Sequence, residues 1–209
     1  MNISTREPER VASRISIPDM LTWGRILAIP LLIFLFYIPS AWSDPLAGIL
    51  FALAGITDSL DGYFARKWQQ TTRLGAFLDP VADKLIVATA LVLLVSRADQ
   101  PVWHIGFELK SQVVVVLCAI VIIGREIAVS ALREWMAEIG ARRKVAVTRL
   151  AKFKTIMQIV GLSMLLFRWD FWFIQIYELG LVLTVVAAVL TLWSAADYLR
   201  MAWPDLKRK

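Results

Sequence analysis

Six apolar runs, each about as long as a membrane is thick, set the strongest limit on how this chain can fold. The runs cover approximately residues 20–38, 46–66, 76–96, 112–135, 146–167 and 173–199. A helix needs roughly 20 apolar residues to cross about 30 Å of hydrocarbon, and only helices or closed barrels satisfy backbone polar groups in lipid. The runs lack the alternating polarity of barrel strands. We therefore predict an all-α integral membrane protein, a bundle of six transmembrane helices.

The composition excludes an ordinary soluble domain, because 58% of the residues are hydrophobic and only 19% are charged. The formal net charge of +6 is typical of a protein that binds polyanions. The basic residues form short clusters between the apolar runs instead of one polar face, so an anionic lipid surface is favoured and nucleic acid is excluded as a partner. The single cysteine, Cys118, lies inside an apolar run and is interpreted as a packing residue.

Lysines and arginines cluster in alternate connections: before the first run, after the second, after the fourth and at the end of the chain. The positive-inside rule therefore places both termini in the cytoplasm. We divide the chain into an amphipathic N-terminal arm on the cytoplasmic leaflet (1–19), a six-helix domain (20–199) and a basic cytoplasmic tail (200–209).

Four carboxylates lie within the second and third apolar runs: Asp58, Asp61, Asp79 and Asp83. Each acid near the middle of a spanning helix costs roughly 2.5 to 3.5 kcal/mol on insertion scales, so the four cost on the order of 10 kcal/mol without compensation. A polyvalent cation is the simplest compensating group.

On each of these runs the acids share one helical stripe with small residues: Asp58, Asp61, Gly62 and Ala65 on the first, and Gly75, Asp79 and Asp83 on the second. The short polar connection predicts antiparallel neighbouring helices, whose facing stripes can gather four carboxylates around one or two hard cations. Ligation by oxygen alone indicates Mg²⁺ or Mn²⁺, with Ca²⁺ as a substitute. Two ions would suit phosphoryl transfer.

A second feature of this region is space beside the acids. Gly62 and Ala65 are small, and Arg66 supplies a planar fork of donors that suits phosphate oxygens. Small residues also allow close helix packing in membranes, which is the alternative interpretation. Next to the carboxylates, we favour a site for a bulky anion.

The pattern Asp58-x-x-Asp61-Gly62-x-x-Ala65-Arg66, then eight residues, then Gly75-x-x-x-Asp79-x-x-x-Asp83 closely resembles the signature of the CDP-alcohol phosphatidyltransferases. Residues 17–25, 124–140 and 151–158 are similar to segments of the bacterial members that make phosphatidylglycerophosphate. The resemblance covers nearly the whole chain. It implies transfer of the phosphatidyl group from CDP-diacylglycerol to sn-glycerol 3-phosphate, releasing CMP, at the cytoplasmic face of a bacterial inner membrane. This step belongs to phosphatidylglycerol and cardiolipin biosynthesis.

The resemblance also implies a role for each signature residue. Asp58, Asp61 and Asp79 would hold a dinuclear Mg²⁺ or Mn²⁺ site, and Asp83 would be a further ligand and the general base for the glycerol hydroxyl. The cytidine diphosphate portion of the lipid would lie against Gly62, Ala65 and Arg66, while Gly75 would let the helices approach.

An acceptor that carries a phosphate needs cations of its own. The fourth and fifth runs supply four candidates: Arg125, Arg133, Lys152 and Lys154. The alternative is that these side chains reach out to anionic head groups, which is the favoured interpretation for Arg149. We interpret Glu126 as a partner that orients an arginine, and Arg25 as part of the wall of the lipid site.

Other functions stay open at this point. A related transferase could use inositol phosphate, serine or phosphatidylglycerol as acceptor, although the cations favour a phosphorylated one. A divalent-cation transporter is a more remote alternative, because its acids would follow a path through the membrane instead of clustering towards one face. A purely structural bundle gives no reason to keep four buried acids. Relatives often form dimers, and no motif here identifies a homodimer interface.

Overall fold

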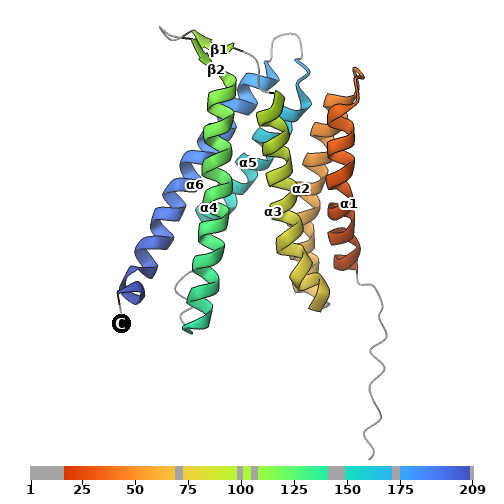
Figure 1. Cartoon of the computed structure of the whole chain (residues 1–209). Helices are drawn as coiled ribbons and strands as arrows, with labels where there is room; N and C mark the ends of the chain where they lie inside the picture. Colours follow the sequence, from red (N-terminus) through yellow and green to blue (C-terminus); the bar gives the residue numbers. More distant parts are fainter. Residues whose placement is uncertain are drawn as a thin grey trace, which may run out of the picture.

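The structure, a computed structural model, describes residues 17–68, 73–97, 101–104, 108–140, 149–170 and 175–207. These residues contain six helices and one short hairpin (Figure 1). The elements are α1 (Ile17–Tyr37), α2 (Ser43–Trp68), α3 (Arg73–Arg97), β1 (Pro101–His104), β2 (Glu108–Lys110), α4 (Ser111–Glu138), α5 (Arg149–Phe167) and α6 (Ile176–Leu206). The all-α fold class is therefore confirmed. Each helix end lies within a few residues of its predicted position, except that α6 continues beyond its predicted end. The antiparallel β1–β2 hairpin was not predicted.

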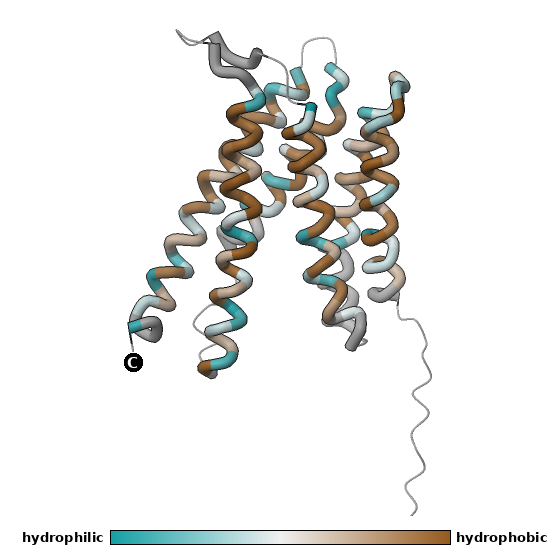
Figure 2. The backbone as a smooth tube through the Cα atoms, viewed as in Figure 1, coloured by the Kyte–Doolittle hydropathy of each residue, from teal (hydrophilic) through white to brown (hydrophobic). Residues whose placement is uncertain are grey.

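Three of the helices are long and apolar enough to cross a membrane, over Met20–Tyr37 of α1, Ser111–Glu138 of α4 and Ile176–Trp203 of α6. A shorter apolar segment, Phe153–Phe167, lies in α5. Large apolar side chains such as Leu27, Leu117 and Trp193 are exposed on the outside of the bundle, as in a protein surrounded by lipid. Figure 2 shows the apolar stretches along the helices. The chain is a membrane protein, and the count of six spans stays a prediction.

The helices alternate in direction along the chain, so both ends of the described bundle lie at one side (Figure 1). We call this side the lower end: it holds the start of α1, the end of α2, the start of α3, the end of α4 and the end of α6. Trp42 and Trp169 meet edge-to-face at the opposite, upper end, with ring centroids 5.2 Å apart. Tryptophans are enriched at membrane interfaces, and the place of this contact fits such an interface.

Helix α1 packs along both α2 and α3, whereas α2 and α3 contact each other over only a few residues. Further contacts join α2 to α5, α5 to α6, and α4 to both α3 and α6, and smaller ones join α3 to α5 and α4 to the hairpin. The two helices with the acidic stripes are antiparallel, as predicted, but they are joined mainly through α1. Side chains of α1 can therefore reach the space between the stripes.

The main core lies between these helices and includes Leu32, Phe51, Leu91 and Leu162. Cys118 belongs to this core, which confirms its packing role. A second, smaller core joins the lower parts of α4 and α6, through Val129, Met136, Tyr198 and Ala202. We call it the α4–α6 cluster.

Two helix ends can be compared with the predicted bounds of the N-terminal arm and the C-terminal tail. Helix α1 already begins at Ile17, and residues 1–16 lie outside the described part of the chain. Helix α6 continues to Leu206, so most of the segment predicted as a basic tail, 200–209, is helical.

Candidate active site

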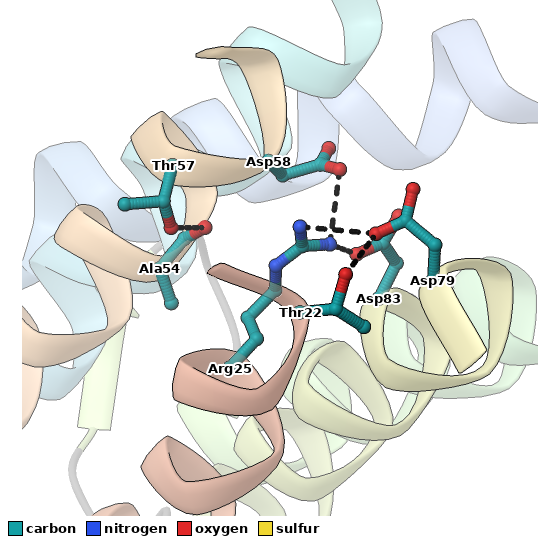
Figure 3. A network of polar contacts seen from close by, with 7 residues as sticks. All are labelled: Thr22, Arg25, Ala54, Thr57, Asp58, Asp79 and Asp83. Atoms are coloured by element: carbon teal, nitrogen blue, oxygen red, sulfur yellow. Dashed lines mark hydrogen bonds and ion pairs between the residues drawn. The ribbon is translucent and has the colours of Figure 1, made fainter. Parts of the chain in front are cut away.

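The guanidinium of Arg25, on α1, lies between the carboxylates of three of the predicted acids (Figure 3). Its Nη1 is 3.1 Å from Oδ1 of Asp58, and its Nη2 is 3.2 Å from Oδ1 of Asp79. Nη1 also forms an ion pair with Oδ1 of Asp83. Thr22, one turn earlier on α1, donates a hydrogen bond from Oγ1 to Oδ1 of Asp79 at 3.2 Å. One guanidinium thus connects α1, α2 and α3.

Burial explains why these groups meet. The Arg25 side chain is only 1% exposed, whereas those of Asp58, Asp79 and Asp83 are 35%, 40% and 35% exposed. A buried guanidinium is strongly destabilising unless acceptors surround it, and clustered carboxylates repel one another unless a cation lies between them. Each charge therefore lowers the cost of the other, while the acids stay accessible from one side.

The structure brings Asp58, Asp79 and Asp83 together, as the two stripes predicted. The backbone of α2 continues through the predicted residues Asp61, Gly62, Ala65 and Arg66, but their side chains lie outside the described part. Gly75 lies in the first turn of α3.

The three acids were also tested as a metal site. Within the described residues, no three acidic, histidine or cysteine side chains lie close enough together to hold one metal ion. The donor set nevertheless suits a hard divalent ion, because it consists of carboxylate oxygens that already converge on one cationic group. The metal assignment stays a prediction.

A cavity of about 410 Å³ extends from these acids towards α4 and α5. Five cationic and three acidic side chains line it: Arg25, Lys84, Arg125, Arg133 and Lys154, with Asp58, Asp83 and Glu126. The rest of the wall is mostly apolar, including Ile122, Ile127 and Ile159. The cavity is therefore lined by both acidic and cationic side chains, and its volume is that of a small-molecule site.

Three of the four predicted phosphate-binding residues lie on this cavity. Arg125 is 9% exposed and donates from Nη1 to Oε2 of Glu126 at 2.7 Å, as the interpretation of Glu126 predicted. The Nε of Arg125 is buried and has no hydrogen-bond partner among the described residues. Lys154 is 4% exposed. Lys152 lies in the first turn of α5, but its side chain is outside the described part.

Arg133 reaches the cavity from a more exposed position on α4. Its Nη2 donates to the hydroxyl of Tyr198 on α6 at 2.8 Å. The guanidinium carbon also lies 5.0 Å from the centre of the Tyr198 ring. The third predicted cation is therefore held by an aromatic side chain of another helix.

Sequence reasoning underestimated Arg25 and missed Thr22, Lys84 and Tyr198. The sequence did contain one signal for Arg25. A cation inside an apolar run is costly without a partner of opposite charge, just as the four acids are. Nothing local marks Tyr198, because its partner is 65 positions away.

A sequence model of the CDP-alcohol phosphatidyltransferases matches residues 15–193, which include every predicted site residue. The chain belongs to this family. The protein from Salmonella choleraesuis called CDP-diacylglycerol–glycerol-3-phosphate 3-phosphatidyltransferase is 47% identical over 191 residues, 91% of this chain and 97% of the relative. The protein of the same name from Escherichia coli K12 is 46% identical over the same shares.

The fold of this phosphatidyltransferase also occurs in a solved structure. The crystal structure of phosphatidylinositol phosphate synthase from Mycobacterium tuberculosis matches with a TM-score of 0.62 and 19% identity. The match covers 92% of this chain and 93% of that one. At this identity the likeness establishes the shared fold.

Proposed function

We propose that this phosphatidyltransferase transfers the phosphatidyl group of CDP-diacylglycerol to sn-glycerol 3-phosphate, giving phosphatidylglycerophosphate and CMP. The observation that carries the proposal is the single cavity that joins Asp58 and Asp83 to Arg125, Arg133 and Lys154. The name shared by relatives at 46 to 47% identity supports the same acceptor. The bacterial relatives support a site in the inner membrane, and the basic connections support its cytoplasmic side.

The acids would act first as a binding site for cations. Asp58, Asp79 and Asp83, together with Asp61, would hold two Mg²⁺ or Mn²⁺ ions. When bound, these ions would offset the negative charge that builds up on the pyrophosphate during transfer. The signature residues Gly62, Ala65, Arg66 and Gly75 would surround the cytidine diphosphate portion of the lipid.

Asp83 is the proposed general base, because it belongs to the acid cluster and also lines the cavity. The acceptor hydroxyl oxygen would form a bond to the phosphorus that carries diacylglycerol, while the bond from this phosphorus to the CMP oxygen breaks. Asp83 would take the hydroxyl proton, and CMP would leave with the electron pair. Close positioning is essential, because a carboxylate near cations is a weak base.

The cations would hold the other end of the acceptor. A phosphomonoester carries close to two negative charges, and the apolar wall around Arg125, Arg133 and Lys154 strengthens its attraction to them. Lys152 would add a fourth cation. Serine carries no phosphate that could pair with these cations, so a phosphorylated acceptor is favoured.

The experiment measures CMP release by the purified protein with CDP-diacylglycerol, Mg²⁺ or Mn²⁺, and one acceptor at a time. We expect release with sn-glycerol 3-phosphate and not with inositol phosphate, serine or phosphatidylglycerol. Asp83→Asn should lower turnover at least about 100-fold, because it removes the proton acceptor. Binding of CDP-diacylglycerol should stay measurable, since Asp58, Asp61 and Asp79 keep their carboxylates.

Asp44→Asn is the matched control for this variant, because Asp44 pairs with Arg97 at the upper end of the bundle. Near-normal turnover in Asp83→Asn would exclude Asp83 as the base. Release with a different acceptor would overturn the acceptor assignment. Uptake of divalent ions into sealed vesicles without turnover would favour a transporter.

A further inference from the structure

The contact between Arg133 and Tyr198 joins the cavity wall to the last helix. Nη2 of Arg133 donates to the Tyr198 hydroxyl at 2.8 Å, and the same ring lies 5.0 Å from the guanidinium carbon. Both interactions fix the guanidinium relative to one ring. They differ from the contact of Arg125, whose partner Glu126 is an acid on the same helix.

The Tyr198 ring is itself immobilised by packing. It is 1% exposed and belongs to the α4–α6 cluster with Val129, Met136 and Ala202. A close-packed ring keeps its position, and so does the hydroxyl that it carries. The position of the Arg133 side chain is therefore set by the packing of α6 against α4.

The chemistry of the partner matters as much as its rigidity. A phenol accepts a hydrogen bond without neutralising the guanidinium, whereas a carboxylate would offset its charge. The guanidinium has five N–H donors, and the bond to Tyr198 uses one of them. Arg133 thus keeps its full charge and other donors for an anion in the cavity.

We propose that Tyr198 is a positioning residue for the acceptor, because it holds Arg133 at the cavity before the acceptor phosphate binds. The inference rests on the proposed function, in which Arg133 binds that phosphate. A free arginine side chain loses rotamer freedom when it binds a ligand, and an arginine that is already ordered avoids this cost. Tyr198 also lies beyond residues 15–193, the part that matches the family.

The test uses the full chain in lipid-supplemented detergent, with both substrates varied. Tyr198→Phe keeps the ring and removes the hydroxyl. We expect the KM for sn-glycerol 3-phosphate to rise about two- to tenfold, the range for ordering one long side chain. The KM for CDP-diacylglycerol and kcat should change less than about twofold, since Tyr198 contacts neither the acids nor the reacting atoms.

Tyr177→Phe is the matched control, because Tyr177 lies on the same helix and packs against another arginine, Arg168, at 5.6 Å near the upper end. Its KM values should equal those of the wild type. Arg133→Gln should raise the KM for the acceptor more than Tyr198→Phe does. In the Arg133→Gln background, Tyr198→Phe should have no further effect on this KM, because it acts only through Arg133.

Several outcomes would overturn the inference. These are an unchanged acceptor KM in Tyr198→Phe, a loss confined to kcat or thermal stability, and an undiminished effect in the Arg133→Gln background. Failure of the proposed function is distinct, since the wild type would then release no CMP with sn-glycerol 3-phosphate. If it used another phosphorylated acceptor, the same KM comparison with that acceptor would decide the role of Tyr198.

Discussion

At the residue scale, Arg25 determines the electrostatics of the acid cluster. Its guanidinium contacts Asp58, Asp79 and Asp83 from a side chain that is 1% exposed. Since the three acids are each more than a third exposed, water and other cations can still reach them. Arg25 therefore stabilises the fold from the buried side and leaves the other side of the cluster open to ligands.

Replacing Arg25 by methionine keeps most of the apolar stem of the side chain and removes the charged guanidinium. Three neighbouring carboxylates would then lack their buried counter-ion. We expect a loss of about 2 to 3 kcal/mol, below the 3–5 kcal/mol typical of fully buried pairs because the acids are partly hydrated. This corresponds to a fall in melting temperature of roughly 4–12 °C for a chain of this size. The measurement is thermal unfolding in detergent with a chelator, and added Mg²⁺ should restore part of the loss.

Arg200→Met is the matched control for Arg25→Met. Arg200 is 83% exposed and lies 3.8 Å from Asp197, so its removal should cost less than about 1 kcal/mol. Equal melting temperatures for the two variants would contradict the role assigned to Arg25.

At the element scale, α5 packs through glycines against α6. A Cβ at Gly161 would lie 2.6 Å from Oγ1 of Thr184 and 3.1 Å from the carbonyl oxygen of Gly180. Thr184 cannot easily yield, because it is 1% exposed and its hydroxyl donates to that same carbonyl at 2.8 Å. The two helices thus approach through backbone atoms, as small residues allow in membranes. Helix α5 carries Lys154, so this crossing also fixes one wall of the cavity.

Gly161→Ala should therefore push α5 away from α6. We expect a destabilisation of about 1 to 3 kcal/mol, the usual cost of overpacking, measured as a lower melting temperature in detergent.

Gly124→Ala serves as the control, because a Cβ at Gly124 on α4 meets nothing within 4 Å. Alanine favours a helix by about 1 kcal/mol over glycine, so the control should be neutral or more stable. A similar loss in both variants would mean that the crossing is not close-packed.

At the scale of the whole molecule, the acid cluster lies in the half of the bundle nearest the lower end. Asp79 is six residues after the start of α3, roughly 9 Å along the axis at 1.5 Å per residue. The start of α1, the end of α2, the start of α3, the end of α4 and the end of α6 lie at the same end (Figure 1). A water-soluble acceptor and CMP therefore have their shortest path to the site from this side.

Labelling of single cysteines should reveal which side of the membrane this is. In a Cys118→Ala background, Ser40→Cys reports on the upper end and Lys207→Cys on the lower end. We expect a membrane-impermeant maleimide to label Ser40→Cys in intact spheroplasts, and Lys207→Cys only after permeabilisation. The physical reason is the excess of lysine and arginine in the lower connections. The reverse pattern would place the site on the outer face.

The helices and the ingredients of the site could be predicted without the structure. Apolar length and the absence of alternation predicted six helices, and local spacing put Asp58, Asp79 and Asp83 on two stripes. These features depend only on residues close together in the chain, and on the energetic cost of charge in lipid. The cations Arg125, Arg133 and Lys154 could be predicted for the same reason.

The sequence did not reveal which helix faces meet. Helix α1 packs on both acidic helices, so Arg25 contacts Asp58 and Asp79 across 33 and 54 positions. Tyr198 holds Arg133 across 65 positions. Local spacing limits which side chains share a face of one helix, but the pairing of faces minimises the energy of all six helices together. The roles of Arg25 as counter-ion of the acids and of Tyr198 as partner of Arg133 therefore became visible only in the packed bundle.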